Sequence, residues 1–271
     1  MHVLSLVGSD ADEAVARLVR RLDGRVATVE RLPETDPDAE TPGTTASYGL
    51  ASDGSWVAAG AERPLDGLLD SLAPEYDYAL VTGFDDARLP TAVVGDAEFE
   101  DERPDDARSD GALFVAESAA EADLDELAAR LDDAEPRVTL GSLVDRVKRS
   151  PGADRAGAVA TFTGRVRAKD AEDDARTVRL EFEKYEGVAE PRMEAIGREI
   201  ASREGVEEVA MHHRTGVIDD GEDIVFVVVL ADHREEAFRA VEDGINRLKD
   251  EVPIFKKETT VEEEFWVHDR E

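Results

Sequence analysis

Apolar residues recur along this chain in short runs and in helical stripes, and their order predicts different folds in its two halves. In the first half, runs predict strands at 3–7, 26–29, 78–81 and 113–115, and stripes predict helices at 10–22 and 124–131. Strands that alternate with helices are typical of an α/β domain with a mostly parallel sheet. The charged stretch 96–111 is expected to be a loop and 132–138 a linker, so this domain is predicted to span residues 1–134.

The pattern in the second half, residues 135–271, predicts an α+β domain. Strands are expected at 158–166, 178–182, 209–213 and 224–230, and helices at 191–202 and 235–249. The run IVFVVVL at 224–230 is apolar at every position, which indicates a strand that is covered on both faces. The stripe in the longest helix is Phe238, Val241, Ile245 and Leu248, and Pro253 stops that helix.

The composition restricts the class of protein. The net charge is −33, but 41% of the residues are hydrophobic, so an acid-coated folded protein from a very saline cytoplasm is favoured over disorder. Such a charge opposes general nucleic-acid binding. The chain has no cysteine, which excludes disulfides and thiolate nucleophiles. No signal peptide and no apolar run of the roughly 20 residues that span a membrane is found, so a soluble cytoplasmic chain is expected.

Lysine is nearly absent, and its placement points to chemistry. Arginine supplies 26 of the 32 cations, and three of the six lysines lie between Lys249 and Lys257. Lysine differs from arginine in that it loses its proton when buried or crowded by other cations. The cluster therefore predicts acid–base or anion chemistry. The alternative is a helix end, where cations offset the carbonyl dipole.

Cationic residues at four places in the second half are expected to converge on a pocket for an anionic substrate. Each alone is compatible with a solvated surface charge, and a helix N-terminus adds to the preference for anions. The four places are Arg165 with Arg167, His233 with Arg234, Lys249, and Lys256 with Lys257.

The pair His212-His213 looks like a metal site, but the sequence argues against one. Adjacent residues on a strand point to opposite faces of the sheet. No third histidine and no cysteine lies at a useful spacing. No metal is therefore expected.

Several stretches of the second half resemble the large catalytic subunit of molybdopterin synthase, the MoaE family, over about residues 137–271. They are AGAVATFTGRVR, LEFEKYEGVAEPRM, HHRTGVIDDGEDIVFVVVLADHREEAF, INRLKDEVPIFKKE and a final FWV. The resemblance implies an α/β hammerhead fold and a homodimer formed by this domain. It also implies conversion of cyclic pyranopterin monophosphate to molybdopterin, with no cofactor. The sulfur would arrive on a ubiquitin-like small subunit of the MoaD type, as a thiocarboxylate on its C-terminal Gly-Gly, in a heterotetramer.

The resemblance also implies roles for the cationic residues. Lys249 falls on the family's key lysine and Lys256 on its second basic cluster, so these two are the catalytic candidates, for proton transfer or as a nucleophile. Phe255 stands where tryptophan is usual, and Arg165 where lysine is common. The substrate-binding candidates are Arg165, Arg167, His233, Arg234, Lys257 and Glu258.

The first half resembles the MobB family of adaptors for molybdopterin-guanine dinucleotide synthesis, through PGTTASYGLASDGSWVAAG and DYALVTGFDDARLPTAVV. MobB proteins are P-loop nucleotide binders. Here the first strand is followed by GSDADEAVARL, without the Gly-Lys-Ser/Thr of a phosphate cradle. A degenerate P-loop-like domain is therefore expected. Two other functions stay open: a nucleotide-binding adaptor, and a scaffold or acceptor for ubiquitin-like modifiers.

Overall fold

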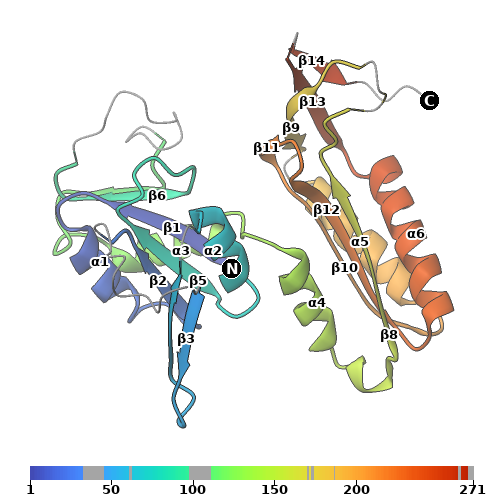
Figure 1. Ribbon diagram of the computed structural model, residues 1–271, viewed down its shortest axis with the longest axis horizontal. Helices are drawn as coiled ribbons and strands as arrows, with labels where there is room; N and C mark the ends of the chain where they lie inside the picture. Colours follow the sequence, from blue (N-terminus) through green and yellow to red (C-terminus); the bar gives the residue numbers. More distant parts are fainter. Residues whose placement is uncertain are drawn as a thin grey trace. The chain divides into compact units, whose positions relative to one another are not determined.

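The computed structural model of the chain consists of two compact units, Met1–Arg137 and Val138–Glu271 (Figure 1). Each unit has its own core and is described by itself. The structure describes residues 1–32, 46–60, 63–97, 111–169, 171, 174–185, 187–261 and 264–267.

The first unit is built on a parallel sheet, as the alternation of strands and helices predicted. Its five strands lie in the order β2-β5-β1-β6-β7, and every neighbouring pair is parallel. The strands β3 and β4 form a separate antiparallel hairpin. The elements are β1 (His2–Val7), α1 (Ala11–Leu18), β2 (Val26–Glu30), β3 (Ala46–Leu50), β4 (Trp56–Gly60), α2 (Leu65–Leu72), β5 (Tyr78–Thr82), β6 (Thr91–Val94), β7 (Phe114–Ala116) and α3 (Leu124–Asp133).

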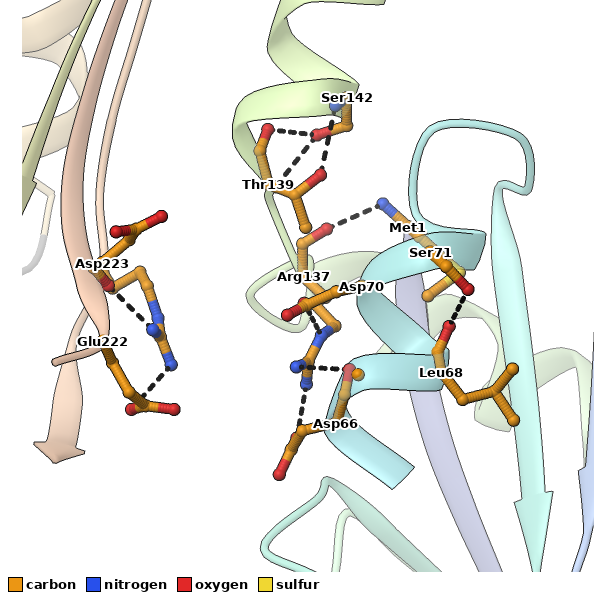
Figure 2. Close-up of polar contacts among 12 residues, drawn as sticks. Met1, Asp66, Leu68, Asp70, Ser71, Arg137, Thr139, Ser142, Glu222 and Asp223 are labelled. Atoms are coloured by element: carbon orange, nitrogen blue, oxygen red, sulfur yellow. Dashed lines mark hydrogen bonds and ion pairs between the residues drawn. The ribbon is translucent and has the colours of Figure 1, made fainter. Parts of the chain in front are cut away.

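Helices cover both faces of this sheet, which explains why its strands are apolar at nearly every position. On β1, Leu4 and Leu6 pack with α1 and α3, whereas Val3 packs on the other face with Leu69 of α2. Arg137 closes the unit (Figure 2), because its guanidinium binds Asp66 at 3.0 Å and Asp70 at 2.8 Å, both on α2. A parallel sheet is stable only with both faces covered in this way.

The sequence pattern and the structure of the first unit differ in detail. The helix predicted at 10–22 ends at Leu18, because the amides of Arg20 and Arg21 bond to carbonyls three residues back, at 3.3 and 2.8 Å. Such bonds tighten the end of a helix into turns. Most of the loop predicted at 96–111, namely 98–110, lies outside the described residues.

The second unit has two antiparallel sheets, which confirms the predicted α+β class. One sheet has the order β10-β12-β8 and the other β11-β9-β13-β14. The elements are α4 (Leu140–Lys148), a 3-10 turn (Ala153–Arg155), β8 (Ala158–Arg165), β9 (Thr177–Lys184), α5 (Ala189–Ala201), β10 (Val206–His213), β11 (Gly216–Asp219), β12 (Asp223–Ala231), α6 (Arg234–Glu251), β13 (Ile254–Thr260) and β14 (Glu264–Val267).

The central strand β12 has helices on both of its faces. Val227 and Val229 pack against α5 and α6 on one face, while Phe226 and Val228 pack against α4 on the other. The pattern did not predict α4, which begins with a capping box between Thr139 and Ser142, shown in Figure 2. The apolar run of β12 therefore reflects a strand at the centre of three layers.

Candidate active site

Helix α6 carries candidate residues at both of its ends. It follows β12, packs on the three-stranded sheet, and runs back beside that sheet toward the start of β12 (Figure 1). His233 is its N-cap and Arg234 its first residue, while Lys249 lies in its last turn. At a rise of about 1.5 Å per residue, the fifteen steps from Arg234 to Lys249 span about 22 Å.

The other cationic residues lie at the Lys249 end of the sheet. Arg165, the last residue of β8, pairs with Asp223 at the start of β12, and Ala158 pairs with Ala231 at its end. Arg165 and Lys249 are therefore at one end of the unit, and His233 and Arg234 at the opposite end. The expectation that all four cationic places converge is wrong within a single chain, because the length of α6 separates them.

The turn after β8 is held in place by its neighbours. Val166 is buried between the exposed Arg165 and Arg167, and its amide donates to the carbonyl oxygen of Glu222 at 2.9 Å. The guanidinium of Arg165 donates to the carbonyl oxygen of Gly221 at 2.8 Å. The two arginines thus flank one anchored residue and face solvent, as an anion-binding turn requires.

A network of ion pairs fixes the end of α6 that carries Lys249. Glu251 accepts hydrogen bonds from Arg247 at 2.7 and 3.2 Å, and it also accepts one from Arg192 on α5. Arg247 in turn donates to Glu199 on α5 at 2.6 Å, and this hydrogen bond is the main reason that the pKa of Glu199 is lowered. The network joins α5 to α6 beside the exposed Lys249, so it limits the positions which that helix end can take.

The two lysines of β13 point to opposite faces of the four-stranded sheet. Lys256 pairs with Phe182 of β9, on the face where Leu180 and Phe182 are buried. Lys257 pairs with Glu181 on the other face and lies 3.7 Å from its carboxylate. Glu258 returns to the Lys256 face and accepts a hydrogen bond from the Thr177 hydroxyl. The structure therefore groups Lys256 with Glu258 and sets Lys257 apart.

Sequence reasoning did not single out Lys184, the last residue of β9. Its side chain is 8% exposed, it lies on the same face as Lys256, and its ammonium group is 3.4 Å from Glu190. The sequence did contain an indication of this position, because Leu180, Phe182 and Lys184 occupy alternate positions and therefore share one face of a strand.

The histidine pair lies on β10, and its two members face opposite sides. The ring of His213 is buried, packs edge-on against Phe182 at 4.8 Å, and places Nδ1 2.7 Å from the carbonyl oxygen of Arg214. Within the described ranges no group of three His, Cys, Asp or Glu side chains could hold a metal ion. In those same ranges no helix is long and apolar enough to cross a membrane.

In the first unit, the connection from β1 to α1 is closed by the chain itself. The amides of Ser9 and Asp10 donate to the carbonyl oxygens of Asp96 and Val94, at 2.8 and 3.2 Å. The Asp10 carboxylate accepts from the amide of Ala119 at 3.1 Å. A phosphate cradle uses free amides at this place. Here they are engaged, and an acid stands beside them.

The chain is similar to known proteins over its full length. The MoaE protein family model matches residues 134–251. A probable molybdopterin synthase of Haloferax volcanii is 58% identical over 272 residues, which cover 100% of both chains. The molybdopterin synthase catalytic subunit of Bacillus subtilis is 43% identical over 115 residues, 42% of this chain and 72% of that protein. A MobB homologue of Bacillus stearothermophilus matches 49% of this chain and 100% of its own, at 20% identity and a TM-score of 0.33.

Proposed function

Because this chain belongs to the molybdopterin synthase family and is therefore an enzyme of molybdenum cofactor biosynthesis, we propose that its second unit carries out sulfur transfer to a pterin. The substrate is cyclic pyranopterin monophosphate, and two sulfurs are installed to give the dithiolene of molybdopterin. The observation that carries the proposal is the placement of Arg165 and Lys249 at one end of the unit, next to the strand that bears Lys256.

In this proposal the two arginines bind the substrate. A guanidinium holds a phosphate through two parallel hydrogen bonds, which gives both strength and a fixed orientation. Arg165 and Arg167 are exposed on an anchored turn, so they can reach an anion without rearrangement of the backbone. The buried Val166 between them belongs to the same apolar cluster as Phe182, the partner of Lys256. The phosphate would therefore lie within reach of β13.

The lysines supply the chemistry. Lys249 serves as a proton donor, or as a nucleophile toward the carbonyl carbon of the partner's terminal glycine, with Lys256 as the second candidate. In the nucleophilic role a carbon–nitrogen bond forms as the carbon–sulfur bond breaks, and the sulfur leaves to the pterin. The chain has no cysteine, so the sulfur must stay on the partner until it is transferred. That partner is a ubiquitin-like small subunit with a thiocarboxylate on its C-terminal Gly-Gly. Glycine lets such a tail pass through a narrow site.

A homodimer would complete the site. His233 and Arg234 are too far from Lys249 of the same chain to touch one substrate molecule, by about 22 Å along α6. In a two-fold dimer, the Arg234 end of one α6 can lie beside the Lys249 end of the other. Two small subunits on such a dimer would give a heterotetramer.

The first unit acts in this proposal as a docking module, derived from a MobB-like domain that no longer binds nucleotides. The engaged amides of Ser9 and Asp10 support this role over that of a nucleotide-binding adaptor. A scaffold for ubiquitin-like proteins would need neither arginine at the substrate turn. It stays the second candidate function because the same tail that delivers sulfur also places a carboxyl group beside lysine amines.

Reconstitution with the pterin and a thiocarboxylated small partner tests the main proposal. Lys249→Ala should lower product formation by at least about 100-fold, the usual worth of a positioned acid or base. Lys148→Ala, at an exposed position on α4, is the matched control and should leave the rate unchanged. Turnover of the Lys249→Ala chain within about twofold of the unaltered chain would contradict the assignment.

Mixing two inactive chains tests whether the site is shared. If Lys249→Ala and Arg234→Ala chains form mixed dimers at random, each mixed dimer contains one intact site, and about a quarter of the full activity returns. No recovery after confirmed subunit exchange would mean that each site is built within one chain.

A further inference from the structure

The β3–β4 hairpin of the first unit is a ribbon with every residue exposed. Its two strands pair from Ala46 with Gly60 to Leu50 with Trp56, and none of the residues 46–60 is buried or half-buried. Figure 1 shows it extending away from the parallel sheet of its own unit. A two-stranded ribbon is marginally stable alone in water and usually needs a packed face.

The register of the hairpin places its large apolar side chains on one face. Leu50 lies opposite Trp56, and Tyr48 lies opposite Ala58, so these four residues share a face. Tyr48, Leu50 and Trp56 are 75, 79 and 58% exposed. The other face carries Ser47, Gly49, Val57 and Ala59, which are mostly small.

This apolar face is large enough to contribute to an interface. With roughly 200 Å² for each large side chain, the three exposed fractions amount to about 400 Å² per copy. Two such faces in contact would remove about 800 Å² from water through these side chains alone. Flanking backbone and alanines bring the total near the ~1,000 Å² of a specific interface.

The charge of the hairpin indicates what covers it. Between residues 46 and 60 the only ionised side chain is Asp53, at the turn, in a chain whose net charge is −33. Two copies of such a chain repel each other over most of their surfaces. A neutral apolar face is where a second copy meets the least repulsion, whereas a basic partner would find a single carboxylate there. A flat face of this kind is also self-complementary under a two-fold axis.

We propose that the hairpin is a self-association surface, in which the faces bearing Tyr48, Leu50 and Trp56 of two copies pack against each other. The contact joins the first units of two chains and does not depend on the chemistry of the second unit. The contact gives the first unit a function in assembly, and the parallel sheet of that unit takes no part in it.

The absence of cysteine allows a direct test on the full chain. Packed sheets lie about 10 Å apart, so a bismaleimide of about that span should join two copies of an Ala58→Cys chain in high salt. Ala59→Cys is the matched control, because Ala59 is the next residue on the same exposed strand and faces the other way. Adding Leu50→Asp to the Ala58→Cys chain should abolish the cross-link by placing a charge in the packed face.

The cross-linking rates show whether a second copy of the chain covers the hairpin face. Cross-linking at least about tenfold faster for Ala58→Cys than for Ala59→Cys supports the proposal, since random collision treats two exposed neighbours alike. Equal rates, faster cross-linking from Ala59→Cys, or no cross-link from either position overturns it.

Tryptophan emission provides a second readout. The chain has two tryptophans, so a Trp266→Phe chain reports Trp56 alone. Its emission should be blue-shifted and should move to the red when Leu50→Asp is added. A Trp56 that emits as in water in the assembled protein overturns the proposal. So does a blue shift that persists in a chain whose Ala58→Cys variant does not cross-link, because the cover is then the chain itself.

Discussion

The ion-pair network at the end of α6 makes a quantitative prediction about Glu251. Glu251→Gln keeps the size of the side chain and removes its charge. The carboxylate accepts two hydrogen bonds from Arg247, at 2.7 and 3.2 Å, and one from Arg192. The amide of glutamine keeps one acceptor oxygen, puts a donor in place of the other, and lacks the charge that pairs with both arginines. The side chains of Arg247 and Glu251 are only 19 and 28% exposed.

The expected cost follows from this geometry. Hydrogen bonds to charged groups contribute about 1.5–3 kcal/mol each when buried. Partial exposure and the remaining bond from Arg247 to Glu199 reduce the loss, so the free energy of unfolding of the second unit should fall by about 1–2 kcal/mol. The matched control on the same helix is Glu235→Gln, because Glu235 lies 3.8 Å from Arg239 and both side chains are largely exposed. That change should cost no more than about 0.5 kcal/mol.

Urea denaturation in a Trp56→Phe background measures the effect, because Trp266 on β14 then reports the second unit alone. Glu251→Gln should also lower kcat more than it raises KM, since Lys249 lies two residues earlier on the same helix end. Equal destabilisation by the two glutamine substitutions would refute the reasoning about this network.

Three further predictions concern other parts of the chain. The hydroxyl of Tyr78 donates to Asp132 at 2.7 Å, which raises the pKa of Tyr78 to about 12. The bond therefore stabilises the first unit below the ordinary pKa of about 10 and is lost as the pH rises through 12; Tyr78→Phe should lower the melting temperature by circular dichroism at pH 8, and the difference should narrow above pH 11. Gly8 has a φ of 109°, and an added Cβ would lie 2.3 Å from the carbonyl oxygen of Val94, so Gly8→Ala should cost the first unit about 2–3 kcal/mol. Gly54→Ala, where φ is also positive but no atom lies within 4 Å, should cost about 1 kcal/mol. Thermal melting followed by circular dichroism at pH 8 measures both glycine substitutions. A fragment of residues 135–271 in high salt should be a dimer by light scattering; a folded monomer would contradict the dimer proposed for the second unit.

The elements that the sequence predicted well are those whose apolar pattern is regular. Strand β12 and helix α6 were found within two residues of their ends, because one is almost wholly apolar and the other carries a stripe. Of the four residues predicted for that stripe, Val241, Ile245 and Leu248 are buried, whereas Phe238 is 66% exposed. Strand β13, with the sequence IFKKETT, was missed. All of its residues except the exposed Phe255 are half-buried, and polar residues lie on both faces, so alternation of apolar and polar positions is absent.

The candidate site was only partly predictable for a different reason. The types and the order of the cationic residues indicated a site for anions. Whether these residues meet in one pocket depends on the distances between them in the fold. Helix length alone separates Arg234 from Lys249, by about 22 Å, and this could have been worked out from the predicted helix. The opposite orientations of Lys256 and Lys257 required the register of β13, which the sequence did not reveal.

That register has a consequence for how the chain can change over evolution. The phase of β13 is set just after α6, where the carbonyl oxygen of Pro253 accepts a hydrogen bond from the amide of Tyr185 at 3.2 Å. Side chains on a strand alternate, so inserting or deleting one residue between Val252 and Ile254 would exchange the faces of Lys256 and Lys257. Both lysines would still be present in the sequence, yet each would occupy the other's surroundings. The number of residues in this short connection is therefore constrained as strictly as the identity of the lysines.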